Sequence, residues 1–264
     1  MRRSSLFWGI VIVLAGVLLL LQPLYPAFNF WAIFWPLLLI LAGIWFLLGP
    51  SLFRRDFRSE TISIPLEGAV EADIRFRHGA GSLTIGALSD GSELLSGTCV
   101  GGVDMKVHRH ADRVKARLST SPDVWFGFPG TMGGHGLAWD IKLNRSVPME
   151  IDIESGASEA TIDLTDLKVS ELQVQTGASS TDITLPAAAG FTRVVVKSGA
   201  AAVNLHIPQD VAARIYIQSG LAGVSVDTNR FPQASGVYET PGYATAANRA
   251  EIRVETGVGS IDIR

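Results

Sequence analysis

The stretch ESGASEATIDL at Glu154–Leu164 is followed by two similar stretches, QTGASSTDITL at Gln175–Leu185 and KSGAAAVNLHI at Lys197–Ile207. Each places a Ser or Thr before a glycine, and each follows a short alternation of apolar and polar residues. A phrase that recurs at a nearly constant spacing is the sequence signature of a repeat fold. This repeat therefore decides how the rest of the chain is interpreted.

Aligning the chain on this glycine extends the repeat to six units. The aligned glycines are Gly79, Gly156, Gly177, Gly199, Gly220 and Gly257. The spacings from Gly156 to Gly220 are 21, 22 and 21 residues. In all six units the residues five and three before the glycine and six after it are apolar. Because alternation buries one face of a strand, each unit is predicted to be a strand, a corner and a second strand.

The glycine marks a corner where a Cβ would clash or where φ must be positive. One unit cannot bury its apolar face alone, whereas stacked units can. The sequence therefore predicts an all-β domain, a β-solenoid or single-stranded β-helix, over residues 61–264. A β-sandwich of hairpins is the alternative, but it does not explain a glycine-locked period.

Two insertions interrupt the period, near residues 86–147 and 229–248. Within the first, Val103–Val107 and Val114–Leu118 alternate around a polar turn, which predicts a hairpin. The chain closes on Ser260–Arg264, which we expect to be the uncapped strand of the last coil.

The first 53 residues are predicted to form a transmembrane helical hairpin. Runs 6–24 and 30–48 are nineteen residues each and contain no charged residue, close to the thickness of a bilayer core. Pro26 and Asn29 lie between the runs, and residues 54–60 form a basic linker after them. Cleavage of the first run as a signal peptide is the alternative, although no convincing cleavage site follows it.

The positive charges indicate an orientation. Arg2 and Arg3 precede the hairpin, Arg54, Arg55 and Arg58 follow it, and the connecting loop has no charge. Cytoplasmic flanks attract Lys and Arg. Both termini and the soluble domain are therefore expected in the cytoplasm, on a multi-pass membrane protein.

Composition argues against several functions. The net charge is −3 with no basic stripe, so nucleic acid is a poor partner. The lone Cys99 permits no internal disulfide and lacks a neighbouring cation, so it is not expected to act as a nucleophile.

The remaining polar candidates are also explained without a functional site. His108 and His110 are better explained by a solvated hairpin tip than by metal binding. Asp152, Asp163, Glu171 and Asp182 could pair as in a carbohydrate-active β-helix enzyme, which is a further alternative, but they occupy outward positions where polar residues are expected anyway. No catalytic, cofactor or metal residue is expected.

Four aromatic residues near a glycine-rich stretch are the better functional candidates. They are Trp125, Phe126, Phe128 and Trp139. They either cap an open end of the solenoid or dock a partner.

Two regions resemble a known family. The hairpin FWGIVIVLAGVLLLL…FWPLLLILAGIWFLLG resembles the membrane region of LiaI/LiaF-like envelope-stress proteins, and Trp139–Pro186 resembles their toastrack β-solenoid. The resemblance implies a membrane-anchored, non-enzymatic regulator or scaffold of a bacterial cell-envelope stress response. Such a protein would lie in the bacterial plasma membrane and restrain a sensor histidine kinase by protein contact. Self-assembly of the solenoid into homo-oligomers is the alternative.

Overall fold

The computed structural model describes residues 35–36, 38–40, 59–89, 91–120 and 137–264. The predicted membrane hairpin falls almost wholly outside these residues. Helical residues at 35–36 and 38–40 lie within its second run. Across the described ranges, no helix has the length and apolar character needed to cross a bilayer.

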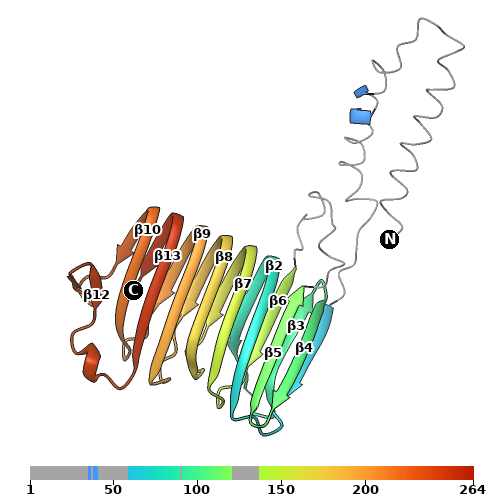
Figure 1. Ribbon diagram of the computed structural model, residues 1–264, viewed down its shortest axis with the longest axis horizontal. Coiled ribbons are helices and arrows are strands. Elements are labelled where there is room, and N and C mark those ends of the chain that lie inside the picture. Colours follow the sequence, from blue (N-terminus) through green and yellow to red (C-terminus); the bar gives the residue numbers. More distant parts are fainter. Residues whose placement is uncertain (1–34, 37, 41–58, 90, 121–136) are drawn as a thin grey trace, which may run out of the picture. The chain divides into compact units, whose positions relative to one another are not determined.

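Residues 59–264 form the all-β fold that the repeat predicts. Six long strands run parallel and bend once each, as Figure 1 shows. They are β2 (Glu71–Ala87), β7 (Met149–Asp163), β8 (Val169–Thr184), β9 (Phe191–His206), β10 (Ala212–Val226) and β13 (Arg249–Ile263). Each contains one of the six aligned glycines, so a coil is one bent strand with two arms.

The spatial order of the coils differs from the order in the chain. The long strands follow one another as β2, β7, β8, β9, β13 and β10. The last strand therefore lies between β9 and β10, and the expectation that Ser260–Arg264 is an uncapped end is wrong. The second insertion explains why the spatial order differs from the chain order. Residues 227–248 lead the chain from the end of β10 along its outer edge and back to the position between β9 and β10. This insertion contains β11 (Gln233–Ala234), β12 (Val237–Glu239) and the 3₁₀ helix η1 (Tyr243–Thr245).

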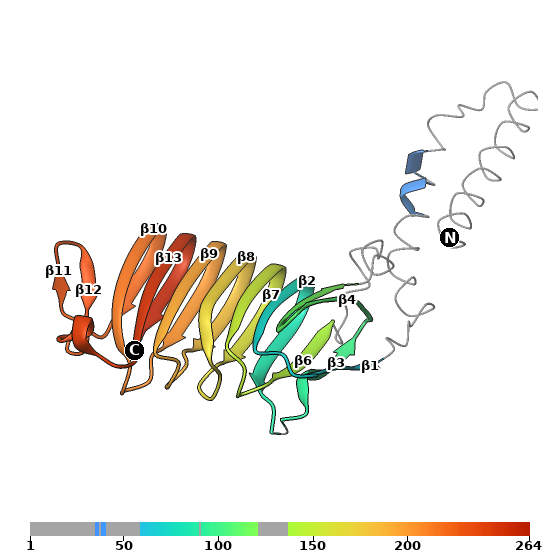
Figure 2. The same cartoon turned by 60° about the horizontal axis from the view of Figure 1, so that its bottom comes forward.

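The first insertion closes the other end of the stack (Figure 2). β5 (Arg113–Thr120) pairs with the first arm of β2, and β6 (Ala138–Leu143) pairs with its second arm. These two strands together occupy the place of one coil. β4 (Val103–His110) pairs with β5 as the predicted antiparallel hairpin. β3 (Glu93–Val100) pairs with β6, and β1 (Ser59–Pro65) pairs with β3, both antiparallel.

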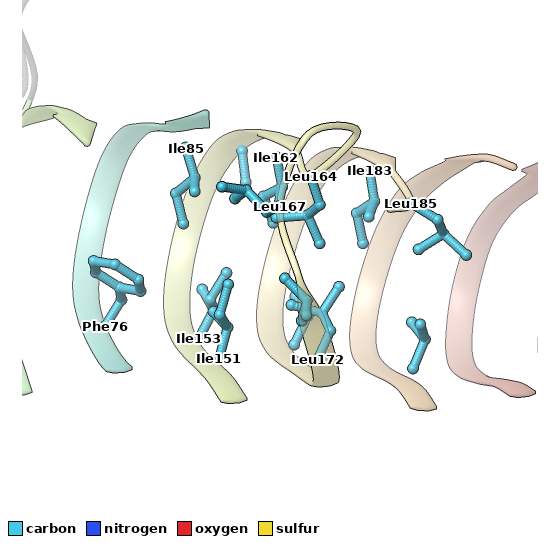
Figure 3. Packing of buried hydrophobic residues seen from close by; sticks show 14 of the residues in the cluster. Phe76, Ile85, Ile151, Ile153, Ile162, Leu164, Leu167, Leu172, Ile183 and Leu185 are labelled. Atoms are coloured by element: carbon cyan, nitrogen blue, oxygen red, sulfur yellow. The ribbon is translucent and has the colours of Figure 1, made fainter. Parts of the chain in front are cut away.

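The core is built from ladders of equivalent aliphatic residues, some of which Figure 3 labels. One ladder places Phe76, Ile153 and Val174 on successive strands, all fully buried. Of the eighteen apolar positions that define the repeat, sixteen are buried, and the exceptions are Ile217 and Val226 on β10. At about 1.5–3 kcal/mol for each buried side chain, these ladders are the main stabilising contribution of the fold.

Close approach of neighbouring coils explains why the corner residue is glycine. A Cβ on Gly177 would lie 2.7 Å from the carbonyl oxygen of Gly156, and one on Gly199 would lie 2.8 Å from that of Gly177. The corner glycines have no positive φ, unlike Gly190, whose φ is 77°. Gly79 differs, since its Cβ would meet only the Thr120 hydroxyl, at 3.7 Å.

Gly177→Ala is therefore expected to lower the free energy of unfolding by about 1–3 kcal/mol, because a methyl group must push two backbones apart. Gly79→Ala is the matched control and should change it by less than about 0.5 kcal/mol. Urea unfolding of both variants measures the difference. Equal losses in the two variants would mean that backbone proximity does not explain the glycine.

Candidate interaction surface

The row of corner glycines lies at the floor of an open groove on the outside of the stack. The groove has a volume of about 1210 Å³. Among the described residues its polar border consists of the side chains two positions before each glycine: Arg77, Glu154, Gln175, Lys197, Glu255 and Gln218. The groove follows from the repeat itself, because a residue without a side chain recurs at the same place on every coil.

The charges along this border are paired. Arg77 Nε lies 3.0 Å from Glu154 Oε2, and Lys197 Nζ lies 3.3 Å from Glu255 Oε2. These side chains are partly exposed, so each pair contributes at most about 1 kcal/mol to stability. The pairing leaves no block of like charge along the groove to attract a polyanion.

Only one of the four aromatic candidates, Trp139, lies within the described residues. Trp125, Phe126 and Phe128 lie outside the described residues, so their role as cap or docking patch stays a prediction. Trp139 lies on β6 with only 1% of its surface exposed. It is part of the group of strands, β1 and β3–β6, that closes one end of the stack, and it offers no surface to a partner. Its position in an alternating strand, AWDIKL, was the signal for burial.

His78 is a buried residue that the sequence reasoning missed as a candidate. It is 1% exposed, its ring packs edge-on against Trp139 at 5.0 Å between centroids, and neither ring nitrogen has a hydrogen-bond partner within the described part of the chain. Burial lowers the pKa of His78 to about 4. One signal was available, because His78 stands where the other five units have Ser or Thr before the glycine.

The predicted hairpin residues His108 and His110 lie exposed on β4. Nowhere in the described ranges do three or more His, Cys, Asp or Glu side chains gather as a metal site would require. Cys99 is buried on β3, where burial, assisted by the Glu60 carboxylate, raises the pKa of its thiol to about 12. The thiol is therefore protonated at neutral pH and is a poor nucleophile.

None of the four carboxylate candidates lies directly opposite another in the strand register. Asp152 is opposite Gln173, Asp182 is opposite Thr161, and Asp163 is opposite Thr184. Three of the four also have local partners: Asp163 accepts a hydrogen bond from the Thr165 amide, Glu171 from Gln173, and Asp182 from Asn204. The Asp163 contact stabilises a turn, and the Asp182 contact joins β8 to β9.

Asp152 is the fourth carboxylate. Its Oδ2 lies 3.9 Å from the Arg75 guanidinium, while its Oδ1 is buried without a partner. Burial, followed by repulsion from Glu154, raises the pKa of this carboxyl. Its acidic neighbours Glu154 and Asp73 are themselves paired with Arg77 and Arg75, so this cluster is explained by ion pairs on the outer face of the strands.

Comparisons with known proteins identify two regions of the chain. The model of the family described as the N-terminal domain of toast_rack, DUF2154, matches residues 53–226. The model of the LiaF transmembrane domain matches residues 7–64. No curated protein matches the chain.

The comparison with solved structures returns two bacterial proteins. One is a proposed cell adhesion protein from Clostridium sporogenes, with 21% identity and a TM-score of 0.72 over 78% of this chain and 98% of that one. The other is a proposed adhesin from Bacteroides fragilis, with 8% identity and a TM-score of 0.31 over 78% and 97% of the two chains. The first likeness shows the fold alone, and the second is too distant to carry an argument.

The buried His78 predicts a pH dependence of stability. The unfolded chain binds a proton at His78 below the ordinary pKa of about 6.5, whereas the folded chain does so only near pH 4. Stability should therefore fall as pH drops through this window, by up to about 1.4 kcal/mol per pH unit from this residue.

His78→Phe keeps a ring against Trp139 and removes the titration, so its urea-unfolding profile should be flatter than that of the wild type between pH 6.5 and 4. His206→Phe, at an exposed position, is the matched control and should keep the wild-type slope. Parallel profiles for wild type and His78→Phe would show that His78 does not titrate as its burial predicts.

Proposed function

This chain belongs to the family described as the N-terminal domain of toast_rack, and we propose that it is a membrane-anchored regulator of a bacterial cell-envelope stress response. In this proposal it acts by protein contact and performs no catalysis. The observation that carries the proposal is the joining of a LiaF-type transmembrane domain at residues 7–64 to a toast-rack domain at residues 53–226. The partner is a membrane protein, with a sensor histidine kinase as the first candidate.

The character of the β domain supports action by contact. Within the described residues the Cys99 thiol is held protonated, and no two of the carboxylate candidates lie directly opposite one another. What the stack does offer is a rigid, repetitive outer surface in which paired charges border a glycine groove. Rigid repeat surfaces of this kind are well suited to binding other proteins.

The anchor has a physical role in this mechanism. A domain tethered to the bilayer meets other membrane proteins at a high effective concentration, so a weak contact can hold a partner. The arginines on both sides of the apolar segment, Arg2 and Arg3 before it and Arg54, Arg55 and Arg58 after it, favour a cytoplasmic β domain. The intracellular face of a sensor kinase is then within reach.

Removal of residues 1–58 should abolish control of an envelope-stress reporter while leaving the β domain folded, because the effective concentration at the membrane is lost. Reporter activity in cells measures the control, and circular dichroism of the purified 59–264 fragment measures the fold. Restoring an unrelated two-helix anchor separates tethering from specific contacts of the native helices. Full repression by the folded, unanchored fragment would contradict the proposal.

Sidedness is tested separately with a reporter cysteine at the exposed Gln209 in a Cys99→Ala background. A membrane-impermeant thiol reagent should label this site only after the cells are opened. Labelling in intact cells would place the β domain outside and would favour an adhesion role instead.

A further inference from the structure

One edge of the stack ends in an incompletely paired strand. β10 pairs with β13 from Ala212 to Val226 on one side. On its other side it pairs with β12 only at Arg214 and Ile215. From Tyr216 to Val226 no other strand of the described residues covers this second side.

The core is also incomplete at this strand. Val224 is 41% exposed, whereas its neighbour Ile261 on β13 is 1% exposed. Ile217 and Val226 are half-buried, although Val254 and Ile263 beside them on β13 are fully buried. The inward apolar residues of β10 therefore lack the next layer that the same positions have in every interior coil.

The free edge carries none of the usual protection against strand pairing. The sequence from Tyr216 to Val226, YIQSGLAGVSV, has no charged residue and no proline. At the opposite end of the stack β4 carries Asp104, Lys106 and Arg109, and β1 ends in Pro65. Charges and prolines on edge strands prevent edge-to-edge association, so the two ends of this domain are built differently.

Ten of the eleven free residues, Tyr216–Ser225, are placed symmetrically about the corner. Their midpoint lies between Gly220 and Leu221, where the strand bends. Val226 is not included, because the same register would place it opposite the partner's Ile215, which β12 already covers. A two-fold axis through this point pairs the first arm of one β10 with the second arm of another, antiparallel, and brings both corners together. In this register Ile217 lies opposite the partner's Val224, and Ser219 lies opposite the partner's Ala222.

We propose that β10 pairs with β10 of a second copy of this chain, which joins two stacks end to end in a closed dimer. The uncharged edge does not repel an identical edge, and the two-fold register covers the half-buried Ile217 with the exposed Val224 of the other copy. The opposite end presents different, charged strands, so the pairing does not propagate into a filament. This inference does not depend on the regulatory role.

The test compares two lysine substitutions in the full-length protein in detergent micelles. Val224→Lys places an ammonium group in the seam between copies, whereas Val258→Lys changes a residue that is 52% exposed on the neighbouring β13, away from the edge. Sedimentation equilibrium should show a dimer for the wild type and for Val258→Lys. The dimer dissociation constant of Val224→Lys should rise by at least about tenfold.

Cross-linking gives a second readout that tolerates loss of stability in the lysine variant. Two differently tagged chains, both Cys99→Ala, carry Ile217→Cys and Val224→Cys respectively. Oxidation of co-expressed chains should give a disulfide-linked mixed dimer. The pair Val258→Cys and Val224→Cys is the control and should not be linked between chains. A monomeric wild type, an unchanged dissociation constant for Val224→Lys, or equal linkage in both cysteine pairs would overturn the proposal.

Discussion

Backbone contact between consecutive corners is the constraint on which the rest of this domain depends. A Cβ on Gly156 would lie 2.5 Å from the carbonyl oxygen of Gly79, and one on Gly257 would lie 2.6 Å from that of Gly199. Real Cβ atoms do not approach an oxygen so closely, so only glycine lets the bent strands stack at hydrogen-bonding distance. Once the corners are aligned, both arms of every strand pair in register, and the aliphatic ladders meet inside. The same missing side chains form the floor of the outer groove.

A stack of this kind has two ends, and the chain treats them differently. At one end β5 and β6 replace a coil, the antiparallel β3 and β4 follow, and Trp139 packs against the buried His78. At the other end the β11–β12 hairpin covers only the beginning of β10. The closed end contains a buried titratable group, His78, so the stability of this end depends on pH. The open end leaves apolar residues available for another copy.

The sequence predicts what the local pattern controls. Period-two alternation and the glycine spacing lead to the bent strands and to the ladder residues, and alternation around a polar turn leads to the β4–β5 hairpin. The pattern could not reveal that β13 lies between β9 and β10, because every coil offers equivalent residues to its neighbours. Val196 is matched equally well by Ile217 or by Val254. Only the path of residues 227–248 distinguishes the two orders, and that path depends on tertiary packing such as the burial of Phe231.

The candidate site was less accessible to sequence reasoning for a related reason. Trp139 follows three other aromatic residues within fifteen positions of the chain, but it belongs to β6, one of the strands that close one end of the stack. His78 was visible as an exception to the Ser/Thr rule, yet its burial depends on a tryptophan that is 61 residues away. The groove and the free edge are properties of the stacked coils, so they can be recognised only when the order of the strands is known.

Disulfide trapping tests most directly whether the glycine corners stack in the spatial order β9, β13, β10. In a Cys99→Ala background, Ala200→Cys with Val258→Cys places two thiols at exposed positions on strands that are adjacent in the structure. Ala200→Cys with Leu221→Cys places them on strands separated by β13. We expect mild oxidation at low protein concentration to close an intramolecular disulfide in the first pair and not in the second. Closure of the Ala200–Leu221 pair with none in the Ala200–Val258 pair would contradict it.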